Sequence, residues 1–170
     1  VRGAFPVLVV FIAWSCNNSG AFTGKWGLKI AWSKNLLINA RSETLLKKPT
    51  FQPLLTSRCI VPATAYFEWR VAGKTRVKNR IFLSDSEAFA LAALTNGNEI
   101  IILTCLPLPE IAHIHRRMPI ILSQDTEKIW IDSTRATPDL LKITRLNYVL
   151  ALKFEEENTG SFNQRELFWW

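Results

Sequence analysis

Glu68 is a carboxylic acid placed where it could exchange protons with a substrate. In the run 66–71, period-two alternation puts Tyr66, Glu68 and Arg70 on one face of a strand and the aromatic residues Phe67 and Trp69 on the other. If the face of Glu68 meets the core, partial desolvation disfavours its charged form and favours proton transfer near neutral pH. The alternative is a surface glutamate paired with Arg70 or with a cross-strand lysine.

His113 and His115 are the only histidines in the chain. Imidazole has an unperturbed pKa near 6.5, so either residue can donate or accept a proton at cellular pH. A hydrogen-bonded core histidine is the alternative for a residue beside Ile114.

Asn39 and Arg41 alternate with Ile38 and Ala40, so their polar side chains should emerge on the same face of an extended segment. An amide can orient a substrate or an amine, and a guanidinium can bind phosphate oxygens bidentately. The alternative is a turn asparagine with a surface salt bridge from Arg41 to Glu43.

These residues lie in three segments, 37–44 (LINARSET), 58–70 (RCIVPATAYFEWR) and 113–119 (HIHRRMP). In order and spacing, the segments resemble the SOS-response-associated peptidase (SRAP) family, over residues 26–122. Members of that family protect abasic sites in single-stranded DNA by a covalent protein–DNA cross-link, and an autopeptidase activity is also ascribed to them. The resemblance implies a hydrolase-like or lyase-like enzyme of the SOS response to DNA damage.

The resemblance also implies roles for individual residues. It makes Glu68 a proton-transfer group, His115 the acid that assists opening of the sugar ring, and Asn39 the group that orients a terminal amine. The residues expected along the DNA are Trp26, Arg41, Thr104 and Arg117. Arg116 departs from the family pattern, which more often has an acidic residue there.

The family nucleophile is a cysteine exposed as residue one after removal of the initiator methionine. Its amine and thiol together can close a five-membered thiazolidine on the aldehyde of an open abasic sugar. This chain begins at Val1, so we expect the N-terminal segment and its nucleophile to be absent, in a fragment or in a divergent member. Cys16 is no substitute, because its amine lies in a peptide bond. A catalytically inactive single-stranded nucleic-acid-binding module is therefore the alternative function.

The positive charge of the chain is unevenly distributed. The net charge is +7, but residues 1–118 carry 15 Lys and Arg against 6 Asp and Glu, whereas residues 119–170 carry 6 against 8. A basic surface with interleaved aromatic residues suits single-stranded DNA, in which phosphates meet cations and bases stack on rings. A soluble basic surface without a partner is the alternative.

The three cysteines, Cys16, Cys59 and Cys105, have no zinc-binding spacing, and their odd number argues against a disulfide framework. We expect no metal, no cofactor and a reducing cytoplasmic location near the nucleoid. A thiol hydrolase that uses Cys59 or Cys105 is a further alternative, although both have apolar neighbours. The apolar run 5–14 fits a buried strand better than a signal peptide, so we expect no membrane contact, and a monomer.

The pattern of the chain predicts a single β-rich α+β domain over residues 1–170, with a mainly antiparallel, barrel-like sheet and a few short helices. Strands are expected at 5–14, 26–32, 58–62, 64–71, 79–84, 88–94 and 99–106, and helices at 42–48, 124–132 and 138–144. Asn96-Gly97 and Ala72-Gly73 predict hairpin turns. Pro49 should end the first helix, and the acidic run 155–157 should be a solvated turn.

Overall fold

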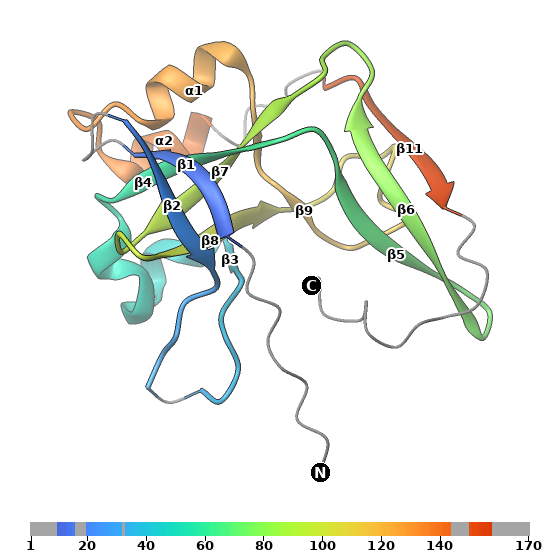
Figure 1. The fold of residues 1–170 in the computed structure, drawn as a ribbon, viewed down its shortest axis with the longest axis horizontal. Coiled ribbons are helices and arrows are strands. Elements are labelled where there is room, and N and C mark those ends of the chain that lie inside the picture. The colour runs from blue at the N-terminus through green and yellow to red at the C-terminus, as the bar shows by residue number, and fades with distance from the viewer. Residues whose placement is uncertain (1–9, 16–19, 32, 144–149, 158–170) are drawn as a thin grey trace.

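The chain has an α+β fold in which strands predominate and the helices are few and short (Figure 1). The computed structural model describes residues 10–15, 20–31, 33–143 and 150–157. Within them the strands are β1 (Val10–Ser15), β2 (Ala21–Trp26), β3 (Asn39–Arg41), β4 (Arg58–Ala63), β5 (Tyr66–Ala72), β6 (Thr75–Leu83), β7 (Phe89–Thr95), β8 (Glu99–Cys105), β9 (Met118–Pro119), β10 (Ile121–Leu122) and β11 (Leu152–Glu157). The α-helices are α1 (Gln124–Trp130) and α2 (Thr137–Ile143), and the 3₁₀ helices are η1 (Leu45–Lys47) and η2 (Pro49–Leu54).

Most strands belong to one large sheet with the order β10-β7-β4-β1-β2-β8-β3. β7 also pairs with β8, so the sheet curls in the barrel-like manner expected, while β3, β9 and β10 extend from the curled part. The pairing is mainly antiparallel, but β2 and β3 run parallel to β8. Gly24 lets β2 lie close to the side chain of the buried Ile100 inside the curled sheet. A Cβ at position 24 would lie 2.7 Å from Cδ1 of Ile100.

A smaller sheet, in the order β11-β6-β5, stands apart from the large one in Figure 1. β5 and β6 form the hairpin expected at Ala72-Gly73, where Gly73 adopts a positive φ of 62°. The hairpin expected at Asn96-Gly97 joins β7 to β8, and Gly97 has a φ of 95°. Its loop is longer than a two-residue turn, and the Asn96 side chain accepts hydrogen bonds from the backbone of Asn98 and Glu99.

β7 and β8 are buried on both faces, which explains their continuous apolar sequences. One face joins the inter-sheet core, a cluster that includes Leu91, Ala93, Ile100 and Ile102 from the large sheet, Tyr66 and Ile81 from the small one, and Ile114 and Met118. The other face joins the outer core under the helices, with Ala92, Leu94, Ile101, Leu103, Phe51 and Trp130. The inter-sheet core therefore holds the two sheets together.

Arg58 connects β4 to the helices. Its side chain is only 2% exposed, and its Nε donates to the carbonyl of Trp130 at 2.7 Å, while Nη2 donates to the carbonyl of Asp132 at 2.6 Å. Nη1 donates to Thr137 Oγ1 at 2.9 Å and to the carbonyl of Leu55 at 3.3 Å. The cation thus satisfies carbonyl groups at the ends of α1 and η2, where the helix dipole is negative.

Three expectations about secondary structure were wrong. The segment 26–32 is not a strand: β2 ends at Trp26, Gly27 has a φ of 105°, and Leu28 forms only an isolated bridge with Leu37. In place of a helix at 42–48 there are η1 and η2, and Pro49 begins η2, where its missing N–H costs nothing.

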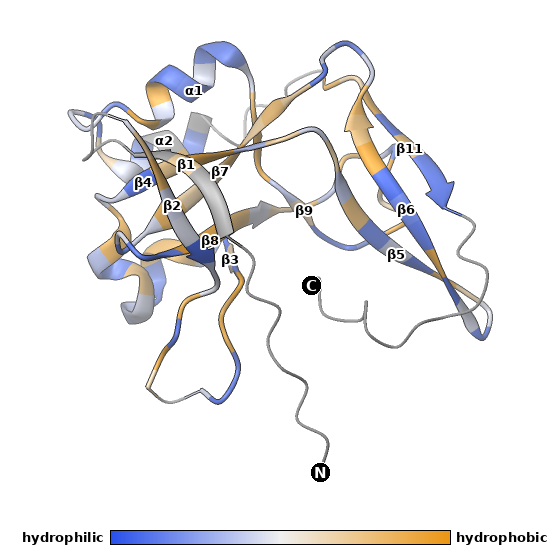
Figure 2. Cartoon of the chain, viewed as in Figure 1, coloured by the Kyte–Doolittle hydropathy of each residue, from blue (hydrophilic) through white to orange (hydrophobic). Residues whose placement is uncertain are grey.

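The acidic run 155–157 is not a turn but part of β11, which Figure 2 shows as a hydrophilic strand. It pairs with β6, where Glu155 meets Arg80 and Glu157 meets Lys78. Opposite charges on neighbouring strands therefore support the pairing.

Of the strand expected at 5–14, residues 5–9 lie outside the described residues. In the described part of the chain, no helix has the length and apolar character needed to span a membrane.

Candidate active site

Glu68 is buried inside the structure, with 2% of its surface exposed. It lies on β5 on the same face as the buried Tyr66, while Phe67 and Trp69 on the other face are partly exposed, so the alternation expected for this strand is confirmed. The surface-pair alternative is wrong, because Arg70 pairs with Glu156 instead. Burial raises the pKa of Glu68, although contact with His115 acts in the opposite direction.

His115 is the partner of Glu68. Its Nδ1 lies 3.2 Å from Oε1 of Glu68, so the two groups form an ion pair when the imidazole is protonated. Pairing with Glu68 raises the pKa of His115, and burial opposes that effect. His113 is exposed and instead packs edge-on against Phe154. Of the two histidines, the structure therefore places His115, to which the family resemblance gives a role, next to Glu68, to which it also gives a role.

The surroundings of the His115 ring determine which nitrogen is free. Nδ1 lies 3.0 Å from the backbone oxygen of Arg117, to which it donates when it is protonated, and it accepts from the backbone N–H of Arg117 at 3.3 Å when it is not. A protonated Nδ1 donates to the carboxylate of Glu68 or to that oxygen, and the raised pKa favours this state. Nε2 has no partner among the described residues, and the side chain is 34% exposed. A protonated His115 is thus held on one side and can donate from the other.

Arg117 joins three elements at this site. Its guanidinium binds Glu43 bidentately, with Nη1 2.8 Å from Oε1 and Nη2 2.9 Å from Oε2. Nη2 also donates to the carbonyl and hydroxyl oxygens of Thr104 at 2.7 and 3.2 Å. Thr104, at the end of β8, is 3% exposed. The alternative salt bridge from Arg41 to Glu43 is wrong, because Glu43 pairs with Arg117.

Asn39 and Arg41 lie on the side of the large sheet that faces β5. In the parallel ladder Asn39 is opposite Ile102 and Arg41 is opposite Thr104, and Ile102 belongs to the inter-sheet core with Tyr66. The Oδ1 atom of Asn39 is buried without a hydrogen-bond partner among the described residues, whereas Arg41 is exposed. The two side chains therefore share a face, as the alternation predicted.

Trp26 is held next to this strand. Its Nε1 donates to the carbonyl of Ile38 at 2.9 Å, and its partly buried ring packs against the inter-sheet core. Trp26 pairs with Ile100 on β8, the strand with which Asn39 pairs at Ile102. The tryptophan thus helps to fix the strand that carries Asn39.

The described cysteines are poor nucleophiles. Cys59 is fully buried, and burial raises the pKa of the Cys105 thiol to about 11. At neutral pH almost none of Cys105 is therefore thiolate, which is the reactive form. This disfavours the thiol-hydrolase alternative for both residues, and Cys16 lies outside the described residues.

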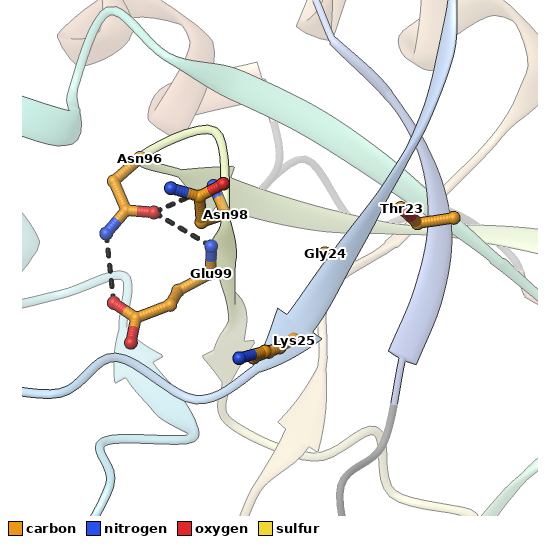
Figure 3. Close-up of a pocket in the computed structure, with 6 residues that line it drawn as sticks. All are labelled: Thr23, Gly24, Lys25, Asn96, Asn98 and Glu99. Atoms are coloured by element: carbon orange, nitrogen blue, oxygen red, sulfur yellow. Dashed lines mark hydrogen bonds between the residues drawn. The ribbon is translucent and has the colours of Figure 1, made fainter.

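Figure 3 shows a surface hollow of about 530 Å³. It is lined by Thr23, Gly24, Lys25, Asn96, Asn98 and Glu99, from β2 and the β7–β8 hairpin. Glu99 and Thr104 stand at opposite ends of β8, roughly 17 Å apart along the strand. The hollow is thus separate from the Glu68–His115 pair.

No group of His, Cys, Asp and Glu suited to a metal ion occurs in the parts of the chain that the structure describes.

Sequence reasoning did not identify Glu43 or Tyr66 as members of this site. Tyr66 is buried next to Glu68, and burial together with the charge of Glu68 raises the pKa of its hydroxyl well above 10.0. The period-two alternation of β5, which puts Tyr66 on the same face as Glu68, could have identified Tyr66 from the sequence. Glu43 contacts Arg117 across 74 sequence positions, which a single sequence does not reveal.

Glu68, on β5 of the smaller sheet, thus lies beside His115, in the loop before β9, at the core between the two sheets. The SRAP family model, described as SOS response associated peptidase, matches residues 6–155. The chain therefore belongs to the SRAP family.

Curated relatives are named as abasic site processing proteins. The chain is 40% identical over 134 residues to YoqW of Bacillus subtilis (strain 168), in an alignment covering 69% of this chain and 60% of YoqW. It is 31% identical over 116 residues to YedK of Escherichia coli (strain K12), covering 62% and 52%. The chain thus spans about 60% of the length of the first of these relatives.

Solved structures share the fold. An X-ray structure of a protein from Bacteroides thetaiotaomicron superposes with a TM-score of 0.77 at 23% identity, covering 89% of this chain and 75% of that one. A protein from Bordetella bronchiseptica gives a TM-score of 0.72 at 22% identity, covering 88% and 83%.

Proposed function

We propose that this chain processes abasic sites in single-stranded DNA, with Glu68 and His115 as its proton-transfer pair. The observation that carries the proposal is the buried Glu68 carboxylate 3.2 Å from Nδ1 of His115, whose Nε2 has no partner among the described residues. Membership of the SRAP family and the names of YoqW and YedK support the substrate.

His115 acts as an acid in this proposal. A closed abasic sugar opens when its C1′–O4′ bond breaks, O4′ takes a proton, and the C1′ hydroxyl passes its proton to water as the C1′ carbonyl forms. Protonated His115 supplies the first proton from Nε2, and the Glu68 carboxylate holds the imidazolium in place. The raised pKa of His115 keeps the acid form populated to higher pH. The product is an aldehyde that an amine can attack.

The resemblance assigns the covalent step to a cysteine at the head of the mature family protein. Its amine condenses with the aldehyde and water leaves, after which its thiol adds to the imine carbon and the thiol proton passes to nitrogen. Asn39, with its buried and unpartnered Oδ1, is the group we propose to orient that amine. The same acid–base pair suits the autopeptidase reaction that the resemblance implies.

The DNA strand is proposed to follow the side of the large sheet next to β3. Arg41 is exposed there and can bind a phosphate, as expected for a basic face that meets a polyanion. Thr104 and Trp26 lie on the neighbouring strands β8 and β2. We propose a monomer that acts on single-stranded DNA near the nucleoid.

The test uses a chimera in which the Cys-led N-terminal segment of a family member precedes residue 1. Incubation with single-stranded DNA that contains one abasic site should give a heat-stable adduct on a denaturing gel. An oligonucleotide without the abasic site and a chimera with Ser in place of the leading Cys are the controls. Tight DNA binding without an adduct from the Cys-led chimera would favour the inactive binding module.

A further inference from the structure

Glu43 is tied to the Glu68–His115 pair through a continuous set of contacts. It follows β3, the strand that carries Asn39 and Arg41, and its two carboxylate oxygens bind the guanidinium of Arg117 at 2.8 and 2.9 Å. The contact joins residues 74 positions apart, so it connects the end of β3 to the loop that carries His115.

The far side of the same guanidinium is held by β8. Nη2 of Arg117 donates to the carbonyl oxygen of Thr104 at 2.7 Å, and that oxygen also accepts from the backbone of Ser42 at 3.0 Å. Arg117 is therefore fixed by two strand ends at once. Its own backbone nitrogen and oxygen contact Nδ1 of His115, as described above.

We propose that Glu43 is a positioning residue for His115. Through the Glu43–Arg117 bridge it fixes the backbone against which the imidazole rests, and so holds Nδ1 toward Glu68. The inference rests on the proposed function, in which His115 is the acid, but it concerns the geometry of the ring rather than the contact with DNA.

The bridge explains Arg117 better than a phosphate contact does. Both terminal nitrogens of Arg117 are already engaged, and its side chain is only 19% exposed. Arg41 is exposed, and its side chain makes no ion pair among the described residues, so it offers the available cation on this face. Bidentate binding requires the planar fork of arginine, which lysine cannot reproduce.

The ring of His115 is the direct reporter of this role. The charged groups around it are Glu68 from β5, Arg116 from its own loop, and the Glu43–Arg117 bridge. The chain has two histidines, so the titration of each can be followed by NMR through its ring signals. The ring signals of His113, which contacts Phe154, are told apart from those of His115 by substituting His113.

The experiment compares Glu43→Gln and Arg117→Lys with the unsubstituted chain and with Asp139→Asn, which removes an exposed ion pair on α2. We expect both test variants to lower the pKa of His115 toward its ordinary value, because the ring is released from Glu68. The matched control should leave the His115 titration unchanged.

Arg117→Lys separates positioning from simple charge. It keeps both charges of the bridge, so a purely electrostatic effect would change the His115 titration in Glu43→Gln alone and would overturn the proposal. Unchanged titration in both folded variants would overturn it as well. A melting curve for each variant establishes that it is folded, and either variant alone can contradict the proposal.

DNA binding distinguishes this inference from the proposed function. Glu43→Gln should bind single-stranded DNA at least as tightly as the unsubstituted chain, because it removes a negative charge. In the Cys-led chimera it should move the high-pH limb of the adduct rate to lower pH. If Glu43→Gln bound DNA tenfold more weakly and left the His115 titration unchanged, the Glu43–Arg117 bridge would serve DNA binding and not the positioning of His115. Absence of DNA binding by every variant would reject the proposed function but leave the titration result standing.

Discussion

Replacing Arg58 by methionine should destabilise the fold strongly. The methionine keeps the apolar stem but removes the cation that donates to the carbonyls of Trp130, Asp132 and Leu55 and to Thr137 Oγ1. These acceptors lie at the ends of α1 and η2 and the start of α2. They would be left partly unsatisfied around a side chain that is only 2% exposed.

The expected loss is about 3–5 kcal/mol of unfolding free energy, the range for removing one partner from a buried charged network. That is a large share of the roughly 5–15 kcal/mol that stabilises a typical domain. For a chain of this size it corresponds to a fall in Tm of about 6–20 °C. Arg58→Lys should lose less, because an ammonium still donates to some of the same oxygens.

Urea denaturation followed by tryptophan fluorescence measures this loss. Arg135→Met is the matched control, because Arg135 is 52% exposed and its one ion pair within the described part of the chain is with Asp132, so it should cost less than about 1 kcal/mol. If Arg58→Met loses less than about 1 kcal/mol with an unchanged m-value, the buried arginine does not hold the helices to β4.

Three further predictions concern the site. Arg41→Ala should weaken binding of single-stranded DNA by about 1–3 kcal/mol in fluorescence anisotropy without lowering Tm, and binding should weaken steeply as salt rises; an unchanged Kd would remove Arg41 from the DNA face. Because the pKa values of Glu68 and His115 are both raised, the folded chain holds these protons more tightly; stability should fall as pH rises from about 4.5 to the folded pKa of Glu68, and again from about 6.5 to the folded pKa of His115. Urea melts should show a shallower fall for Glu68→Gln, and identical slopes would contradict the coupling. With a pKa of about 11 rather than 9.0, Cys105 should react with iodoacetamide about 100-fold more slowly at pH 7.5 than an ordinary thiol, as measured by peptide mass spectrometry; equal reactivity would show an exposed thiolate.

The parts of the fold that follow from local pattern were predictable. The apolar runs of β7 and β8 and the glycines at positions 73 and 97 located the central strands and two hairpins. The alternation in β5 placed Glu68 on the buried face. Each of these features depends on residues close together in the chain, where side-chain period and turn chemistry act directly.

The parts that depend on distant contacts were not predictable. The run 155–157 forms a strand paired with β6, where Arg80 and Lys78 lie opposite it, and the positive φ of Gly27 ends β2 at Trp26, where a strand over 26–32 was expected. Glu43 gave no sign of its contact with Arg117. The roles of Glu68 and His115 came from the family resemblance, which did not state their contact, whereas the residues alone left a surface ion pair as the alternative for Glu68.

The most direct test of the account is the rate at which the Cys-led chimera forms its adduct with abasic single-stranded DNA when Glu68 or His115 is changed. Glu68→Gln and His115→Gln should each slow adduct formation by about 10²–10⁴-fold, the range for losing a general acid–base group, while leaving DNA affinity within a few fold. Asp139→Asn should change neither. Adduct formation at the unsubstituted rate in both site variants would contradict the role of the buried pair.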